Sequence, residues 1–213
     1  MTHKELLQQT DYKLITSIRH SNVKELVYTE LAKNRGWARI ANGYQIIGAF
    51  TFVFFSFKAF IPYYYFRDTT PLFWLVMGLA TSFSLLIILH ELIHAAAYLW
   101  VGVHNLSFGV KWHKFLFYVL SDSTVLNYNQ FKKVSLAPVV IVGVISLLGM
   151  IFFYNRPGFN FFLPIFALHS LFSAGDFGLL CFFQNRPDIE ILTFDVKEEG
   201  KTYFYGRDNS KTM

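Results

Sequence analysis

The chain has 213 residues, of which 54% are hydrophobic and only 15% are charged, and its net charge is +5. This balance lies far from that of soluble globular domains and indicates an integral membrane protein. We expect no nucleic-acid partner, because no basic cluster with interleaved aromatic residues occurs. The single cysteine, Cys181, excludes an intrachain disulfide bond.

Residues 1–42 form an N-terminal segment of mixed polar and apolar character, for which we expect short interfacial helices that begin near Ser21, with its hydroxyl as the helix cap. This segment does not fit a cleavable signal peptide. Four apolar stretches follow within the region 43–183, and each approaches or exceeds the ~20 residues that a spanning helix needs. The expected spans are 43–66, 72–100, 135–154 and 161–183.

The loop 101–134 alternates apolar and polar residues from Leu106 to Trp112, and the run Phe115 to Leu120 ends in a turn signal, which together predict a strand or hairpin. The tail 184–213 contains short strand candidates at Ile189–Val196 and Thr202–Tyr205. The predicted fold class is an all-α membrane protein with four transmembrane helices, a small cytoplasmic hairpin segment and a short cytoplasmic tail.

Lys and Arg are distributed unevenly between the two sides of this arrangement. Residues 1–42 carry seven, the loop 101–134 carries four and the tail after residue 183 carries five, against one each, Arg67 and Arg156, in the two short loops. Because cytoplasmic loops are enriched in Lys and Arg, we expect a multi-pass protein of the cell membrane with both termini in the cytoplasm.

The second span contains the pattern H-E-x-x-H, formed by His90, Glu91 and His94. On a helix the two histidines share a face and can bind one Zn²⁺ ion, and Glu91 can act as the general base that takes a proton from the attacking water. Ionisable residues in a span are costly and are therefore functional candidates. The alternative is that they only form hydrogen bonds to neighbouring helices.

A catalytic zinc ion needs a third protein ligand. Asp176 and His169 are the remaining candidates inside the apolar stretches. If the spans end near residues 100 and 183, Asp176 lies about 10 Å deep, level with His94 at about 9 Å, whereas His169 lies about 21 Å deep. We therefore predict Asp176 as the ligand. A hydrogen-bonded neutral acid remains the alternative for Asp176, and His169 is open to a supporting, substrate-contacting or purely packing role.

These residues resemble a family. The run from His90 to Ala95, Pro138 near the start of the next span and the run from His169 to Asp176 look like the bacterial putative zincin peptidase membrane proteins, related in layout to site-two intramembrane metalloproteases, over about residues 40–205. The resemblance implies an aspartate ligand in a later span and a membrane-associated strand that presents substrate. The order Gly175-Asp176-Phe177-Gly178 lacks the asparagine and second proline of the site-two pattern.

The leading hypothesis is a zinc-dependent intramembrane endopeptidase that hydrolyses peptide bonds of membrane-associated substrates, either peptides or membrane proteins. His90, His94 and Asp176 are its metal ligands and Glu91 is its catalytic base. One alternative is a zinc-binding membrane protein without proteolytic activity, such as a regulatory pseudo-enzyme. Another is a metal-free membrane subunit that binds partners.

Overall fold

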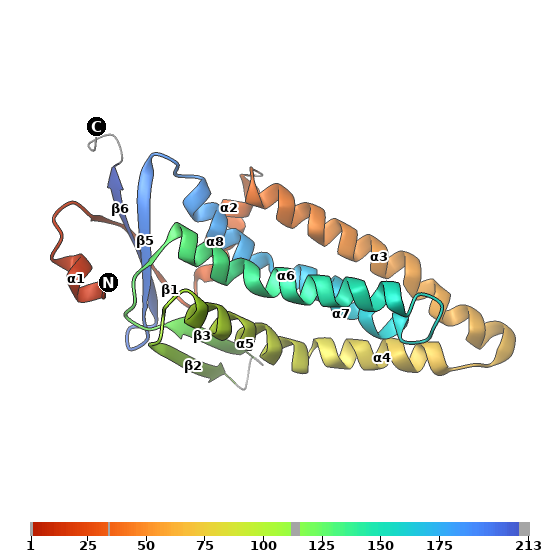
Figure 1. Ribbon diagram of the computed structural model, residues 1–213. Helices are drawn as coiled ribbons and strands as arrows, with labels where there is room; N and C mark the ends of the chain where they lie inside the picture. Colours follow the sequence, from red (N-terminus) through yellow and green to blue (C-terminus); the bar gives the residue numbers. More distant parts are fainter. Residues whose placement is uncertain (1, 34, 112–115, 209–213) are drawn as a thin grey trace. The chain divides into compact units, whose positions relative to one another are not determined.

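The computed structural model describes residues 2–33, 35–111 and 116–208, and most of these residues are helical (Figure 1). The helices are α1 (His3–Leu7), α2 (Val23–Ala32), α3 (Trp37–Phe66), α4 (Thr70–Ser82), α5 (Leu85–Trp100), α6 (Tyr128–Phe152), α7 (Phe159–Phe172) and α8 (Ala174–Gln184). The strands are β1 (Lys13–Arg19), β2 (Leu106–Lys111), β3 (Leu116–Ser121), β4 (Leu126–Asn127), β5 (Ile189–Val196) and β6 (Lys201–Asp208). The predominance of helix agrees with the predicted fold class.

Contacts divide the chain into two compact units. The sheet unit comprises residues 1–38, 91–137 and 175–213, and the helical unit comprises residues 39–90 and 138–174. The chain therefore passes between the units at four points: near the start of α3, inside α5 after His90, inside α6 after Ala137 and at the start of α8.

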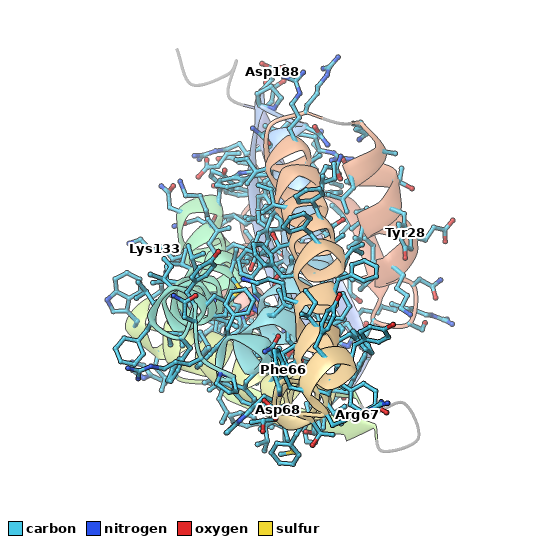
Figure 2. The ribbon with its side chains drawn as sticks, turned by 90° about the vertical axis from the view of Figure 1, so that its right-hand side faces the viewer. Tyr28, Phe66, Arg67, Asp68, Lys133 and Asp188 are labelled. Carbon is cyan, nitrogen blue, oxygen red and sulfur yellow. The ribbon has the colours of Figure 1, made fainter. Side chains whose placement is uncertain are left out.

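In the helical unit, α4 packs closely along α7. A Cβ atom on Gly78 would lie 2.3 Å from the carbonyl oxygen of Phe161, so only glycine permits this approach. The common core draws on α3, α4, α6 and α7 and consists of Ala59, Leu75, Met150, Phe159, Leu163 and Phe166. On α3, by contrast, Phe50, Phe54 and Phe57 are exposed, as expected for a surface in contact with lipid. The helix ends at Phe66, next to Arg67 and Asp68 in the turn to α4 (Figure 2).

Among the described residues, three helical stretches are long and apolar enough to cross a membrane: α3, α6 and Phe159–Gln184, which comprises α7 and α8. The pair α4 and α5 would supply a fourth if it counts as one span, but the two helices are bent by 46°. Near the bend, the hydroxyl of Ser82 donates to the carbonyl of Gly78 at 2.8 Å and that of Ser84 donates to Ala80 at 2.7 Å. Such bonds to carbonyls one turn earlier favour helix bending. The expected second span, 72–100, is thus a broken helix.

Helix α6, which corresponds to the expected third span 135–154, begins earlier than predicted. Asn127 accepts a hydrogen bond from the backbone N–H of Gln130 at 3.0 Å, and the Gln130 side chain accepts one from the N–H of Asn127 at 3.2 Å. This reciprocal cap starts α6 at Tyr128, before residue 135. Pro138 consequently lies inside the helix and not in its first turns.

The sheet unit contains a four-stranded antiparallel sheet in the order β1-β6-β5-β4. Both predicted tail strands are present, as β5 and β6, and they join the sheet with the unpredicted strand β1. The predicted hairpin is also present, with β2 paired to β3, although Trp112 and Phe115 lie outside the described residues.

The expected helix cap at Ser21 is wrong, because Asn22 occupies the cap position before α2. Phe182 of α8 packs on Phe204 of β6, with 4.3 Å between ring centroids.

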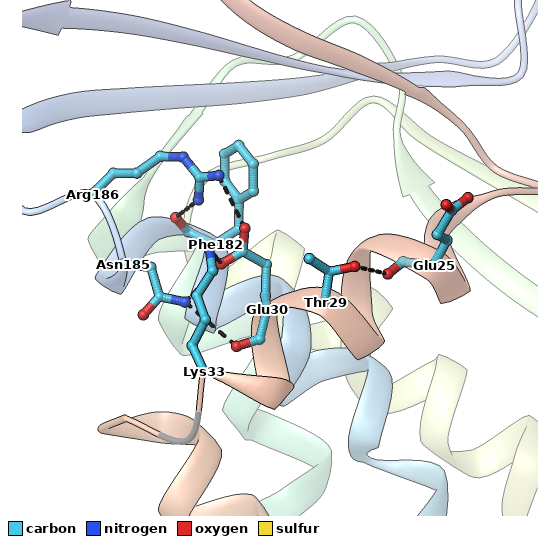
Figure 3. A network of polar contacts seen from close by, with 7 residues as sticks. All are labelled: Glu25, Thr29, Glu30, Lys33, Phe182, Asn185 and Arg186. Carbon is cyan, nitrogen blue, oxygen red and sulfur yellow. Dashed lines mark hydrogen bonds and ion pairs between the residues drawn. The ribbon is translucent and has the colours of Figure 1, made fainter.

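A buried carboxylate joins α2 to the end of α8 within the sheet unit (Figure 3). Glu30 is only 2% exposed and accepts hydrogen bonds from Arg186 at 3.0 Å, Asn185 at 2.6 Å and Lys33 at 2.6 Å. Burial alone would raise the pKa of Glu30, but these three donors outweigh it and lower the pKa below its ordinary value. The pairing compensates the cost of burying the charge.

We predict that Glu30→Gln lowers stability by about 2 kcal/mol, because it leaves Arg186 and Lys33 without their partner charge. Since the pKa of Glu30 is lowered by folding, its contribution is complete above the ordinary glutamate pKa and is lost as the pH falls through the folded value. The difference between wild type and variant should therefore shrink in acid. Thermal unfolding in one detergent across pH measures this, and Glu25→Gln, at an exposed position of the same helix, is the matched control. Equal midpoints for wild type and Glu30→Gln at neutral pH would contradict the prediction.

Candidate metal centre

The motif H-E-x-x-H lies in one turn of α5, a helix formed by a run of Leu, Ile and Ala residues. The ligand atoms of His90, Glu91 and His94 lie within 4.8 Å of one another, and all three side chains are half-buried. The helical spacing predicted from the sequence is therefore present. His90 belongs to the helical unit, whereas Glu91 and His94 belong to the sheet unit.

In the sheet unit, His94 has a defined partner at each ring nitrogen. Its Nδ1 lies 3.0 Å from the carbonyl oxygen of Val134, and its Nε2 lies 3.2 Å from Oδ1 of Asp176. A carbonyl can only accept, so Nδ1 carries the hydrogen in the neutral ring and Nε2 presents a lone pair to the carboxylate. Two acceptors that face each other at this distance require a proton or a cation between them.

The pair fits zinc. With zinc–ligand bonds of about 2.0–2.1 Å and tetrahedral angles, two ligand atoms of one zinc ion lie about 3.3 Å apart, close to the spacing of His94 Nε2 and Asp176 Oδ1. The hydrogen bond from Nδ1 to a backbone carbonyl is the contact that orients a zinc-binding histidine in other proteins. Two imidazoles with one carboxylate also form a typical donor set of catalytic zinc sites.

Glu91 is held by the hairpin. Its Oε2 accepts a hydrogen bond from the backbone N–H of Val119 at 3.0 Å, and Val119 lies in β3 opposite Phe108 of β2. This contact fixes the carboxylate at the edge of a strand.

In the helical unit, His90 contacts His169. Nδ1 of His90 lies 3.3 Å from Nε2 of His169, and Nδ1 of His169 lies 3.2 Å from the hydroxyl oxygen of Tyr44. His169 is fully buried, at 0% exposure. The three polar side chains thus form a continuous chain of contacts across α5, α7 and α3.

The two candidates for the third ligand lie at different motif histidines. Asp176 contacts His94 and His169 contacts His90, and the helix between them is interrupted, since α7 ends at Phe172 and α8 begins at Ala174. Sequence reasoning missed Tyr44 as well as the backbone groups of Val119 and Val134. The hydroxyl of Tyr44 inside an apolar stretch was a signal for a polar contact, whereas backbone partners leave no trace in a sequence.

The fold and the motif define a membrane-type helical protein with a zincin-like site, and the comparison with protein families agrees. The chain belongs to the family described as putative zincin peptidase, whose model matches residues 83–189, half of the chain. The matched range includes the motif, the hairpin and both His169 and Asp176. No match to this chain was found among curated proteins or solved structures.

We predict that purified protein binds about one zinc ion per chain and that the double variant His90→Ala, His94→Ala loses most of it. Asp176→Ala should lower zinc affinity by about two orders of magnitude or more, because it removes the group that faces Nε2 of His94. Metal analysis and competition with a chelator measure both effects. Asp188→Ala, outside the apolar helices, is the control. Full zinc retention in the double histidine variant would rule out this site.

Proposed function

We propose that this chain is a zinc-dependent intramembrane endopeptidase that cleaves membrane-associated peptides or membrane proteins. The observation that carries the proposal is the single turn of α5 that gathers His90, Glu91 and His94 within an apolar helix. Membership of the zincin family supports a metallopeptidase, and three helices of spanning length support a membrane location. The intramembrane character of the cleavage is our inference from these findings together.

Each residue of the site has a distinct role in this proposal. His90, His94 and Asp176 hold the zinc ion, which when bound polarises the peptide carbonyl and favours deprotonation of the attacking water. Glu91 accepts the proton from that water and delivers it to the leaving amine. The carbonyl of Val134 holds the His94 ring in the tautomer that presents Nε2.

The substrate segment would lie extended along the hairpin. The backbone N–H of Val119 donates to Glu91 at 3.0 Å, so β3 lies directly beside the proposed catalytic base. This supports a substrate that binds as an extended chain next to Glu91. Strand addition supplies main-chain hydrogen bonds that do not depend on sequence, so it suits an enzyme that recognises unfolded or unwound segments. A helical substrate would have to unwind locally before it could bind in this way.

The proposal includes the orientation of the protein in the membrane. The excess of Lys and Arg in the segments 1–42, 101–134 and 184–213 supports a multi-pass protein of a bacterial cytoplasmic membrane, with both termini and the hairpin in the cytoplasm. The bacterial assignment comes from the family resemblance alone. In this orientation, water and substrate reach the site from the cytoplasmic side.

Glu91→Gln should retain zinc and lower turnover by at least 10²-fold, because glutamine cannot accept the proton of the attacking water. The measurement compares the membrane proteomes of cells that produce the wild type or the variant, and it scores cleavage products together with the zinc content of the purified proteins. Glu25→Gln, at an exposed position of α2, is the matched control. Identical proteomes combined with bound zinc in both proteins would instead support a non-proteolytic zinc protein.

A topology experiment tests the orientation. Reporter tags at either terminus and at Asp122 should indicate the cytoplasm, whereas tags near Asp68 and Pro157 should indicate the opposite side, because the basic residues concentrate in the first group of segments. Each tagged protein should still bind zinc, which serves as the control for folding. An external signal at Asp122 would reverse the orientation and the proposed route to the site.

A further inference from the structure

We propose that Tyr44 and His169 are positioning residues that act in series to orient His90 for metal binding. This inference rests on the proposed function, since it assigns to His90 the role of zinc ligand. The contacts run from Nδ1 of His90 to Nε2 of His169 at 3.3 Å, and from Nδ1 of His169 to the hydroxyl of Tyr44 at 3.2 Å. All three residues lie in the helical unit.

The chain of contacts has two possible directions of hydrogen bonding, and only one is compatible with metal binding. If Nε2–H of His169 donates to Nδ1 of His90, the neutral His90 ring carries its proton on Nε2 and offers no lone pair there. If Nδ1–H of His90 donates to Nε2 of His169, then Nε2 of His90 presents its lone pair to a metal. In that direction Nδ1–H of His169 donates to the oxygen of Tyr44. A hydroxyl can accept or donate, so Tyr44 does not set the direction alone; through His169 it supplies the acceptor that the metal-binding tautomer of His90 needs, and a metal at Nε2 of His90 selects that direction.

Packing holds this arrangement in place. His169 is fully buried, so its two ring nitrogens depend on protein partners, and the ring of Tyr44 packs edge-on against Phe166 at 5.6 Å between centroids. A Cβ atom on Gly48 would lie 2.3 Å from Oγ of Ser170, so glycine lets α3 approach α7 one turn from Tyr44. A Cβ atom on Gly143 would lie 3.2 Å from the Tyr44 hydroxyl, so α6 approaches this hydroxyl closely at that glycine.

Residues that orient a metal-binding histidine typically contribute 10- to 100-fold to metal affinity. We therefore expect Tyr44→Phe to weaken zinc binding about tenfold and His169→Leu about 100-fold, relative to wild type. His169→Gln should retain most of the affinity, because its amide oxygen can accept from Nδ1–H of His90 near the position of the lost ring nitrogen. Gly143→Ala should weaken binding to a smaller extent, because it displaces the Tyr44 hydroxyl without removing it.

The experiment measures zinc affinity of the full-length purified proteins by competition with a chelator, with Co²⁺ spectra as a second readout of ligand geometry. Tyr64→Phe, a 74% exposed tyrosine of the same helix, is the control and should bind zinc like wild type. A general loss of packing would lower the thermal midpoint of His169→Gln as much as that of His169→Leu without separating their zinc affinities.

Wild-type affinity in both Tyr44→Phe and His169→Leu would overturn the inference, and so would equal losses in His169→Gln and His169→Leu. Wild-type protein that binds no zinc would overturn both this inference and the proposed function. Wild-type protein that binds zinc with the expected order of affinities but cleaves no substrate would support the positioning role and overturn the peptidase proposal alone.

Discussion

The cost of placing ionisable side chains in apolar helices is the constraint on which the site of this protein depends. An imidazole or a carboxylate in such surroundings is stable only if its polar atoms meet partners. Here His94 meets Asp176 and a backbone carbonyl, Glu91 meets a backbone amide, and His90 meets His169. Because these partners come from several elements, the same contacts that compensate burial also fix the direction in which each group points.

Two interruptions of the helices lie close to the site in the sequence. The break between α7 and α8 at Ser173 separates the segment that carries His169 from the segment that carries Asp176. The serines near the bend between α4 and α5 bond to carbonyls one turn earlier, which loosens the helix just before the motif begins. Polar residues at these points therefore shape the path of the chain around the site.

In the sheet unit, the strands and α2 hold α8 in place. Phe182 and Leu180 of α8 join the core formed with Ile191 and Phe204 of the sheet, so α8, which carries Asp176, is anchored by ordinary hydrophobic packing. The buried Glu30 attaches α2 to the residues that follow α8. In the proposed zinc site, a helix fixed along its length and at its end would be a suitable support for Asp176, because metal sites tolerate little movement of their ligands.

The sequence by itself determined the apolar helical character of the protein, the motif helix, a strand or hairpin after it and the two strands of the tail. Apolar runs of spanning length and the spacing of His90, Glu91 and His94 are local properties, as is the alternation in β2, so they can be read without a structure. Asp176 was predicted as a zinc ligand from its estimated depth, and that role stays a prediction; in the structure its Oδ1 lies 3.2 Å from Nε2 of His94. Only the tertiary structure decided the partners: Tyr44 and His169 are 125 residues apart, and Val119 and Val134 contribute backbone atoms that any residue possesses. Such contacts depend on how helices and strands pack, which the local pattern of side chains does not encode.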